Sequence, residues 1–301
     1  MTHPTRRFVL KSTVVAGVML SLPIMVSAQT TPDASRWIIS AEEARTLIAD
    51  GALVFDTRNA DLAQARPING AAAVIWQDFT KTEAPLRGQL LDDDAVLSNR
   101  LRALGVSQDR PVIAVADSRQ GWGEDGRVVW TLRTLGHTQS YLVDGGIDAL
   151  LEDGDLTLAP IGTGDFTVAR TDAYDITKEE LAERLDAPNL VILDTRESRE
   201  FAGETPYGET RGGHVPGAQH IHFQDLVGDD GHILDGDALK ARLASLGVTK
   251  GAEVVSYCTG GIRSGFVTAV LNNAGFNARN YAGSMWEWSA APAEEFPLAT
   301  N

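Results

Sequence analysis

The chain contains two copies of one sequence pattern, and this duplication restricts the possible folds more than any other feature. Five short segments of the first half recur in the same order in the second half. The matched segments are Val54–Arg58 with Ile192–Arg196, Asn69–Ala71 with Pro216–Ala218, Gln77–Phe79 with Gln224–Leu226, Leu104–Val106 with Leu246–Val248, and Tyr141 and Gly145 with Tyr281 and Gly283. A shared order of this kind indicates a duplicated domain.

Within the first copy, helical and strand patterns alternate. Helices are expected from the N-cap Ser40 to about Ala49, over 94–104 and over 126–135, and strands over 52–56, 111–116 and 141–143, with a short apolar piece at Val74–Ile75. Alternation of this kind is typical of a mainly parallel sheet with helices on both faces. The sequence therefore predicts an α/β fold with two tandem domains, residues 35–153 and 174–298, joined by a Gly-, Thr- and Asp-rich linker over 154–173.

The N-terminal residues 1–28 have the features of an export signal. Arg6, Arg7 and Lys11 precede an apolar run over 14–26, which ends in Val26-Ser27-Ala28. The arginine pair is similar to the twin-arginine signal, and the apolar run is short for a membrane span. We expect cleavage after Ala28 and a periplasmic mature chain, by the twin-arginine or the general secretory route, with no membrane span after cleavage; an uncleaved anchor is the alternative.

Composition excludes several kinds of partner and site. The formal net charge is −15 and the pI is about 4.8, which gives no general attraction to nucleic acid or anionic lipid. The single cysteine excludes an intrachain disulfide and a zinc site of several cysteines. His214, His220 and His222 flank a Pro-Gly turn without a standard metal spacing, so we expect no metal there. The cysteine chemistry considered below needs neither a metal nor an organic cofactor.

The single cysteine, Cys258, follows a β-prone segment and precedes a glycine-rich loop. The expected helix over 266–274 begins soon after that loop, and Arg263 lies between them. Loop amides, a helix N-terminus and an arginine all favour thiolate over thiol, and the thiolate is the nucleophile. Gly260 and Gly261 allow several amides to converge on one anion. A lone cysteine is more often a small buried apolar residue, but this setting favours a reactive one.

The segment Cys258-Thr259-Gly260-Gly261-Ile262-Arg263-Ser264 resembles the active loop of the rhodanese family of sulfurtransferases. The resemblance extends to Asp194-Thr195-Arg196 and to Gly213-His214-Val215-Pro216-Gly217-Ala218, and thus to nearly all the chain after the signal. Related phosphatases carry one more residue between cysteine and arginine, which widens the loop for a tetrahedral phosphate. The shorter loop of this chain therefore implies persulfide chemistry.

In the first copy the matching strand ends near Ala116 and Asp117, and neither residue is a thiol. The resemblance thus implies a tandem enzyme whose N-terminal domain is catalytically silent. It implies Cys258 as the nucleophile, which moves a sulfane sulfur from thiosulfate or 3-mercaptopyruvate to cyanide or a thiol. The implied substrate-binding residues are those of the loop after the cysteine, together with Arg199: Thr259, Gly260, Gly261, Ile262, Arg263, Ser264 and Arg199.

Other polar residues near these motifs have structural interpretations. Asp194 and Arg196 recur as Asp56 and Arg58 in the silent copy, which favours a scaffold role. His214 is expected to brace its turn rather than to transfer protons. Trp122, Trp286 and Trp288 are expected to pack in the core or between the domains, although an apolar wall would also protect a persulfide from water.

Two departures from the tandem enzymes leave the donor open. Their anion-binding arginine usually directly precedes an aromatic residue, whereas here Glu200 precedes Phe201 and Arg199 lies one place earlier. The loop also lacks both the lysine of thiosulfate-specific enzymes and the Cys-Gly-Ser-Gly form of mercaptopyruvate enzymes. The alternatives are a periplasmic sulfur carrier, which discharges to a protein acceptor with little turnover, and a cysteine-dependent phosphatase or arsenate reductase.

Overall fold

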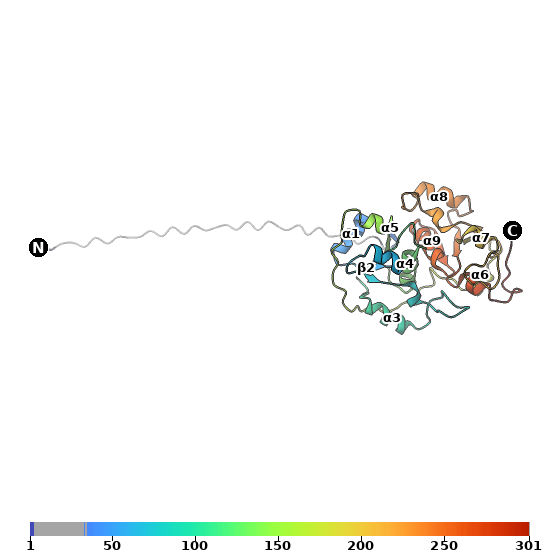
Figure 1. Ribbon diagram of the computed structural model, residues 1–301, viewed down its shortest axis with the longest axis horizontal. Coiled ribbons are helices and arrows are strands. Elements are labelled where there is room, and N and C mark those ends of the chain that lie inside the picture. Colours follow the sequence, from blue (N-terminus) through green and yellow to red (C-terminus); the bar gives the residue numbers. More distant parts are fainter. Residues whose placement is uncertain (3–32, 34, 301) are drawn as a thin grey trace. The chain divides into compact units, whose positions relative to one another are not determined.

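The computed structural model describes residues 1–2, 33 and 35–300, and the predicted export signal lies outside them. Among these residues, no helix combines the length and the apolar character needed to cross a membrane. The described residues from 35 to 300 belong to one compact unit. In Figure 1 the first half of this unit, in blue to green, lies beside the second half, in yellow to red.

The first domain is a five-stranded sheet with strand order β1-β5-β4-β2-β3, and all its neighbouring strands are parallel. Its strands are β1 (Ile38–Ile39), β2 (Leu53–Asp56), β3 (Ala72–Ala73), β4 (Val112–Val115) and β5 (Ser140–Val143). Its helices are α1 (Ala41–Ala49), α2 (Ala60–Ala65), η1 (Trp76–Phe79), α3 (Asp94–Ala103), α4 (Glu124–Thr134) and α5 (Gly146–Leu150). The predicted strands and long helices are all present within a few residues. The apolar piece Val74–Ile75 follows β3 rather than forming a strand.

The second domain has a four-stranded parallel sheet with strand order β7-β6-β8-β9. Its strands are β6 (Leu190–Asp194), β7 (Gln219–His220), β8 (Glu253–Tyr257) and β9 (Asn277–Asn280). Its helices are α6 (Lys178–Ala182), α7 (Ser198–Phe201), η2 (Phe223–Leu226), α8 (Gly236–Ala244), α9 (Ile262–Asn273) and α10 (Ser284–Trp288). The counterpart of β1 is reduced to a single parallel bridge between Asp175 and Asn280.

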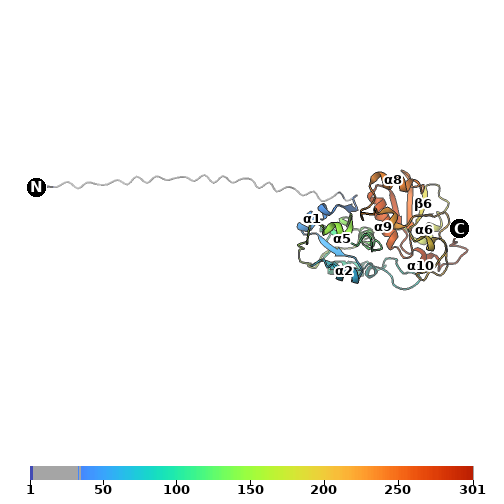
Figure 2. The same ribbon diagram turned by 45° about the horizontal axis from the view of Figure 1, so that its top comes forward.

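The two domains share one hydrophobic core. Residues of α3 and α4 from the first domain and of α8 and α9 from the second belong to the same buried cluster, whereas the outer face of each sheet has its own smaller cluster. Helices α4 and α9 pack directly against each other at the centre of this arrangement (Figures 1 and 2). Burial of a continuous apolar surface across the junction favours a fixed relation between the domains.

The predicted linker is not a free tether. Between residues 154 and 171 it has no regular secondary structure, but its backbone bonds to the first domain, with Gly164 N donating to Arg102 O and Ala169 N to Leu135 O. Phe166 in the same segment is buried in the shared core. The segment therefore belongs structurally to the surface of the first domain.

Two predictions from the sequence are wrong. Helix α9 begins at Ile262 and not near Phe266, because Gly261 adopts a left-handed conformation (φ +83°) and turns the chain directly into the helix. The parallel registers align Val143, and not Tyr141, with Tyr281, while Gly145 and Gly283 do correspond. A short apolar strand offers no internal mark of register, so the two tyrosines suggested a match two residues out of step.

Candidate active site

Cys258 lies where the prediction placed it, directly after β8 and before a tight loop that leads into α9. The residue is 1% exposed. The N–H of Gly261 donates to the Cys258 sulfur at 3.1 Å, and the Cys258 N–H donates to Ser284 Oγ at 3.0 Å. The sulfur therefore sits over the N-terminal end of a twelve-residue helix, with a backbone donor directed at it.

The surroundings of Cys258 favour the thiolate. Burial alone would raise the pKa of the Cys258 thiol, but the Arg263 charge and hydrogen bonding from Ser264 and the Gly260 amide outweigh burial and lower that pKa. The Ser264 hydroxyl is buried and has no other hydrogen-bond partner within the described part of the chain. It is therefore available to an anion on the sulfur.

Glu200 fixes Arg263 beside the loop. The Arg263 guanidinium donates to the two carboxylate oxygens of Glu200 at 2.6 and 2.9 Å and to Thr259 Oγ1 at 2.7 Å. Thr259 Oγ1 in turn donates to Glu200 at 2.7 Å, and the Glu200 side chain is fully buried. Burial opposes ionisation of Glu200, but the hydrogen bonds from Arg263 prevail and lower its pKa. Arg263 therefore keeps its charge near the sulfur in one fixed orientation.

Sequence reasoning missed the role of Glu200. It treated this residue as a departure from the usual arginine-aromatic pair, yet Glu200 is the residue of that region that contacts the active loop. Its only local mark is a capping box with Glu197 at the start of α7, which indicates a helix start and nothing about Arg263.

The Arg199 side chain lies at the surface, whereas the neighbouring Glu200 side chain is buried. Its side chain is 48% exposed and pairs with Glu197 at 2.6 Å, and it approaches the Tyr207 hydroxyl at 3.4 Å. Its predicted contact with the donor stays a prediction.

The other polar motif residues are structural, as predicted. Asp194 and Arg196 form a buried ion pair at 2.6 Å, and Arg196 also donates to Gly213 O at 2.8 Å. The silent copy repeats this pair as Asp56 and Arg58 at 2.7 Å.

His214 braces its turn. Its Nδ1 lies 3.0 Å from Phe201 O, and its ring stacks on the Phe201 ring with the centroids 3.8 Å apart. His220 contacts the Arg196 carbonyl in a similar way, through Nε2 at 2.8 Å. No cluster of three or more potential metal ligands occurs among the described residues.

The strand registers show which residue of the first domain takes the place of Cys258. Asp56 pairs with Val115 as Asp194 pairs with Tyr257, so Ala116 is the counterpart of Cys258. The loop Ala116–Gly123 is twice as long as Cys258–Gly261, and both loops end in a left-handed glycine at a helix N-cap. Counting from those glycines, the buried Asp125 takes the place of Arg263. The silent copy therefore has neither the thiol nor the cation.

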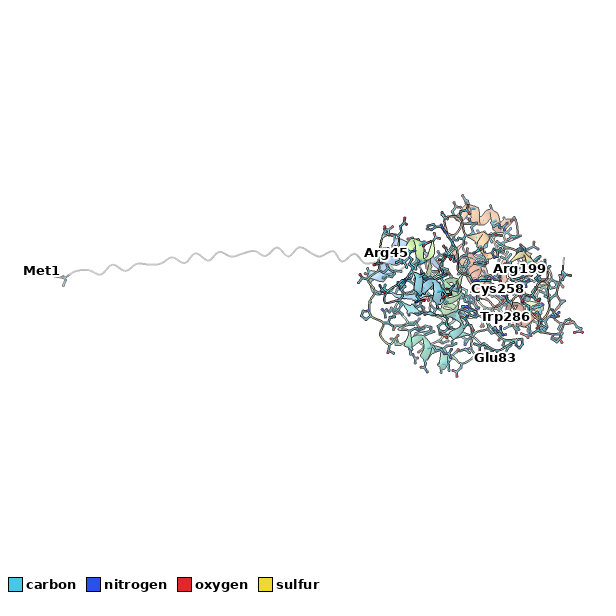
Figure 3. All side chains as sticks on the ribbon, in the orientation of Figure 1. Met1, Arg45, Glu83, Arg199, Cys258 and Trp286 are labelled. Carbon is cyan, nitrogen blue, oxygen red and sulfur yellow. The ribbon has the colours of Figure 1, made fainter. Side chains whose placement is uncertain are left out.

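Aromatic residues from both domains surround Arg263 and the loop. The Arg263 guanidinium lies 5.1 Å from the Trp122 ring and 5.8 Å from the Tyr207 ring. The Trp286 ring lies so close to Gly260 that a Cβ there would come within 2.1 Å of it (Figure 3). Trp122 and Trp286 thus belong to the site, whereas Trp288 is a fully buried core residue, as predicted.

Comparisons with known proteins identify the family of both domains. A family model for the rhodanese-like domain matches residues 40–153 and again residues 177–291. The chain is 34% identical over 222 residues to a probable 3-mercaptopyruvate sulfurtransferase of Pseudomonas aeruginosa, covering 70% of this chain and 75% of the relative. It is 33% identical over 214 residues to a thiosulfate sulfurtransferase of the same organism, covering 67% and 75%.

Solved structures give the same architecture. The crystal structure of the Tum1 protein from Saccharomyces cerevisiae superposes with a TM-score of 0.74 at 19% identity, covering 89% of this chain and 99% of that protein. At this identity the likeness concerns the fold alone.

Proposed function

Because the chain belongs to the rhodanese family and is a sulfurtransferase with two tandem rhodanese-like domains, we propose that Cys258 carries the transferred sulfur as a persulfide. The observation that supports this role most directly is the Gly261 N–H directed at a buried sulfur whose pKa is lowered. A low-pKa thiolate surrounded by fixed donors is both nucleophilic and able to hold a negatively charged outer sulfur.

The proposed reaction is a double displacement. The Cys258 thiolate attacks the sulfane sulfur of thiosulfate, a new S–S bond forms, and the old S–S electron pair leaves with sulfite. With 3-mercaptopyruvate the C–S electron pair leaves with the enolate of pyruvate, which then takes a proton. Cyanide or a thiolate attacks the outer sulfur, and the Cys258 thiolate is released. Amides and hydroxyl groups from Thr259 to Ser264 would stabilise the anionic sulfur.

Donor recognition would use exposed cations near the loop. Arg263 is neutralised by Glu200, which leaves Arg199 and Arg87 as candidates. Arg199 pairs with Glu197. Arg87 lies 4.8 Å above the Trp286 ring, is exposed, and forms no ion pair within the described residues. Arg87 is therefore the better placed of the two to bind an incoming anion.

Export to the periplasm remains part of the proposal, supported by Arg6, Arg7 and the apolar run after them. Fractionation of cells that produce the chain, followed by N-terminal sequencing, tests it. Recovery of the uncleaved chain in the cytoplasm would contradict export.

The central experiment is intact-protein mass spectrometry after incubation with thiosulfate and, separately, with 3-mercaptopyruvate. We expect a gain of one sulfur, about 32 Da, that cyanide removes and that is absent from Cys258→Ser. The faster donor identifies the substrate. A chain that gains sulfur but releases it only to a protein acceptor would be a carrier. No gain from either donor, together with hydrolysis of a phosphate ester or reduction of arsenate, would reject the sulfur-transfer mechanism.

A further inference from the structure

Arg127 connects the silent domain to the active loop. It lies on α4 and is fully buried, yet among the described residues no charged side chain accepts its hydrogen bonds. Its Nη1 donates to Gly261 O at 2.9 Å, and its Nη2 donates to Gly88 O at 2.6 Å. One guanidinium therefore joins the loop of the second domain to a loop of the first.

The packing of α4 against α9 fixes the position of Arg127. A Cβ on Gly126 would lie 2.4 Å from the Cα of Phe266, and one on Gly265 would lie 3.0 Å from the Cα of Arg127. The two helices therefore meet backbone to backbone at this arginine. The guanidinium also lies over the rings of Trp130 and Trp76, at 4.6 and 5.4 Å. The side chain consequently has little freedom to move away from the loop.

A single residue, Gly261, links the Arg127 guanidinium to the Cys258 sulfur. The Gly261 carbonyl accepts from Arg127 and from Asn280 Nδ2, the latter at 3.3 Å, while the Gly261 N–H donates to Cys258. A Cβ on Gly261 would come within 2.2 Å of Arg127 Nη1, so only glycine fits between them. Arg127 thus helps to set the orientation of the N–H that faces the sulfur.

Arg127 also adds a positive charge beside Cys258. Burial lowers the pKa of Arg127 to about 10, opposed by the negative charges of Cys258 and Asp175, so the guanidinium is protonated at neutral pH. Burial raises the pKa of Asp175 to about 7. Asp175 therefore compensates Arg127 only in part near neutrality, whereas Glu200 compensates Arg263 directly.

We propose that Arg127 is a positioning residue for sulfur transfer, supplied by the domain that has no nucleophile. It orients Gly261 toward the Cys258 sulfur and stabilises the thiolate and the persulfide anion. When α4 and α9 are aligned from their N-cap glycines, Arg127 corresponds to Gly265. The first domain therefore supplies the guanidinium, and the second domain has a glycine without a side chain where Arg127 packs. The proposal rests on Cys258 as the nucleophile, but its first test requires no sulfur donor.

The test compares Arg127→Met with Arg127→Lys in the full chain. The control is Arg133→Met, because Arg133 is equally buried on α4 and donates to Ser140 O, away from the loop. The rate of Cys258 alkylation by iodoacetamide is measured from pH 5 to 9, and kcat and KM are measured with thiosulfate. The charged groups around the sulfur are Arg263 on α9, Glu200 on α7, Arg127 on α4 and Asp175 at the domain junction.

For Arg127→Met we expect the alkylation profile to shift upward by about one pH unit, which slows alkylation roughly tenfold below the transition. We expect kcat to fall at least about tenfold with little change in KM, because the loop and not the donor contact is altered. Arg127→Lys should restore the alkylation profile but only part of kcat, because an ammonium cannot reproduce the planar fork that bridges two carbonyls. Arg133→Met should change thermal stability alone.

Equal alkylation profiles and equal kcat for Arg127→Met and Arg133→Met would overturn the proposal. If Arg127→Met does not fold, Arg127→Lys decides, since wild-type kcat in that variant would also overturn it. A shifted alkylation profile in a protein that never gains sulfur would leave the role of Arg127 intact and reject the proposed function instead.

Discussion

At the scale of single residues, the site depends on how its buried charges are compensated. Arg263 has a fully buried carboxylate partner, whereas Arg127 has carbonyl partners and a carboxyl group that titrates near neutrality. Desolvated charges are costly without such partners, so each of these contacts has consequences for stability as well as for the thiolate.

Glu200→Gln is expected to destabilise the fold, because it leaves Arg263 buried without a counter-charge. Removal of one partner from a buried pair costs about 3–5 kcal/mol, measurable by urea unfolding. The control Arg199→Gln removes an exposed charge from the same helix and should cost much less. An equal loss in both variants would contradict the assigned role of Glu200.

The same ion pair makes stability depend on pH. Because folding lowers the pKa of Glu200, its ionised form stabilises the native state above the unfolded carboxyl pKa of about 4.3. This contribution is lost as the pH falls through the lower, folded-state pKa. Below about pH 4.3 the unfolding free energy of Glu200→Gln should therefore fall less steeply than that of the wild type. Parallel curves for the two proteins would show that Glu200 does not contribute.

Arg87 is expected to affect donor binding rather than chemistry. It is exposed over Trp286, whose ring packs on Gly260, and it has no ionic partner among the described residues. Arg87→Gln should raise the KM for thiosulfate several-fold at nearly constant kcat, as the loss of a uniform binding contact does. Arg199→Gln should have a smaller effect, because Glu197 already engages Arg199. The reverse order would assign the donor site to Arg199.

At the scale of elements, the turn from β8 into α9 requires glycine for two separate reasons. Gly261 has a φ of +83°, and a Cβ there would meet Arg127. Gly275, at the other end of α9, has a nearly equal φ of +82° but open space around it. A substitution at Gly275 therefore measures the cost of the left-handed backbone alone, whereas a substitution at Gly261 adds a steric conflict with Arg127.

Gly275→Ala should cost about 1–2 kcal/mol from the left-handed backbone alone and leave Cys258 alkylation unchanged. Gly261→Ala should cost more and should also slow alkylation and abolish the gain of sulfur, since the N–H that faces Cys258 is displaced. Stability curves and alkylation rates of both variants provide the measurement. A reactive Cys258 in Gly261→Ala would show that the loop tolerates the displacement.

At the scale of the whole molecule, the first domain forms part of the candidate active site. Arg127 and Trp122 reach the second domain from it, and the shared core holds the two sheets in one arrangement. The first domain, which has no cysteine at the position of Cys258, thus contributes contacts to the loop of the second domain.

Gly126→Ala tests this dependence from the silent side of the junction. Its Cβ would approach the Cα of Phe266 to 2.4 Å, so the helices must separate, at a cost of at least about 2–3 kcal/mol. We expect sulfur transfer to fall as well, because Arg127 moves with α4. The control Gly236→Ala has open space at the start of α8 and should retain wild-type transfer and stability or gain slightly. Unchanged activity in Gly126→Ala would show that the junction is not coupled to the loop.

The sequence by itself determined the duplicated α/β fold and the order of the strands and long helices along the chain, and it identified Cys258 as the residue that we propose as the nucleophile. These features depend on local periodicity and on a short motif, so their signals lie within a few neighbouring residues. It also indicated that the first copy has no thiol at the corresponding position, but left open whether Ala116 or Asp117 takes the place of Cys258.

Only the tertiary structure decided the register that selects Ala116, the pairing of Glu200 with Arg263, and the contact of Arg127 with Gly261. In the sequence Arg127 is an ordinary polar residue of a predicted helix, 134 positions before the glycine that it contacts. Such contacts follow from how α4 and α9 pack, and packing depends on the shapes of surfaces that are distant in the chain. No local sequence pattern predicts these contacts, because each residue is compatible with its own helix or loop whether or not the contact forms.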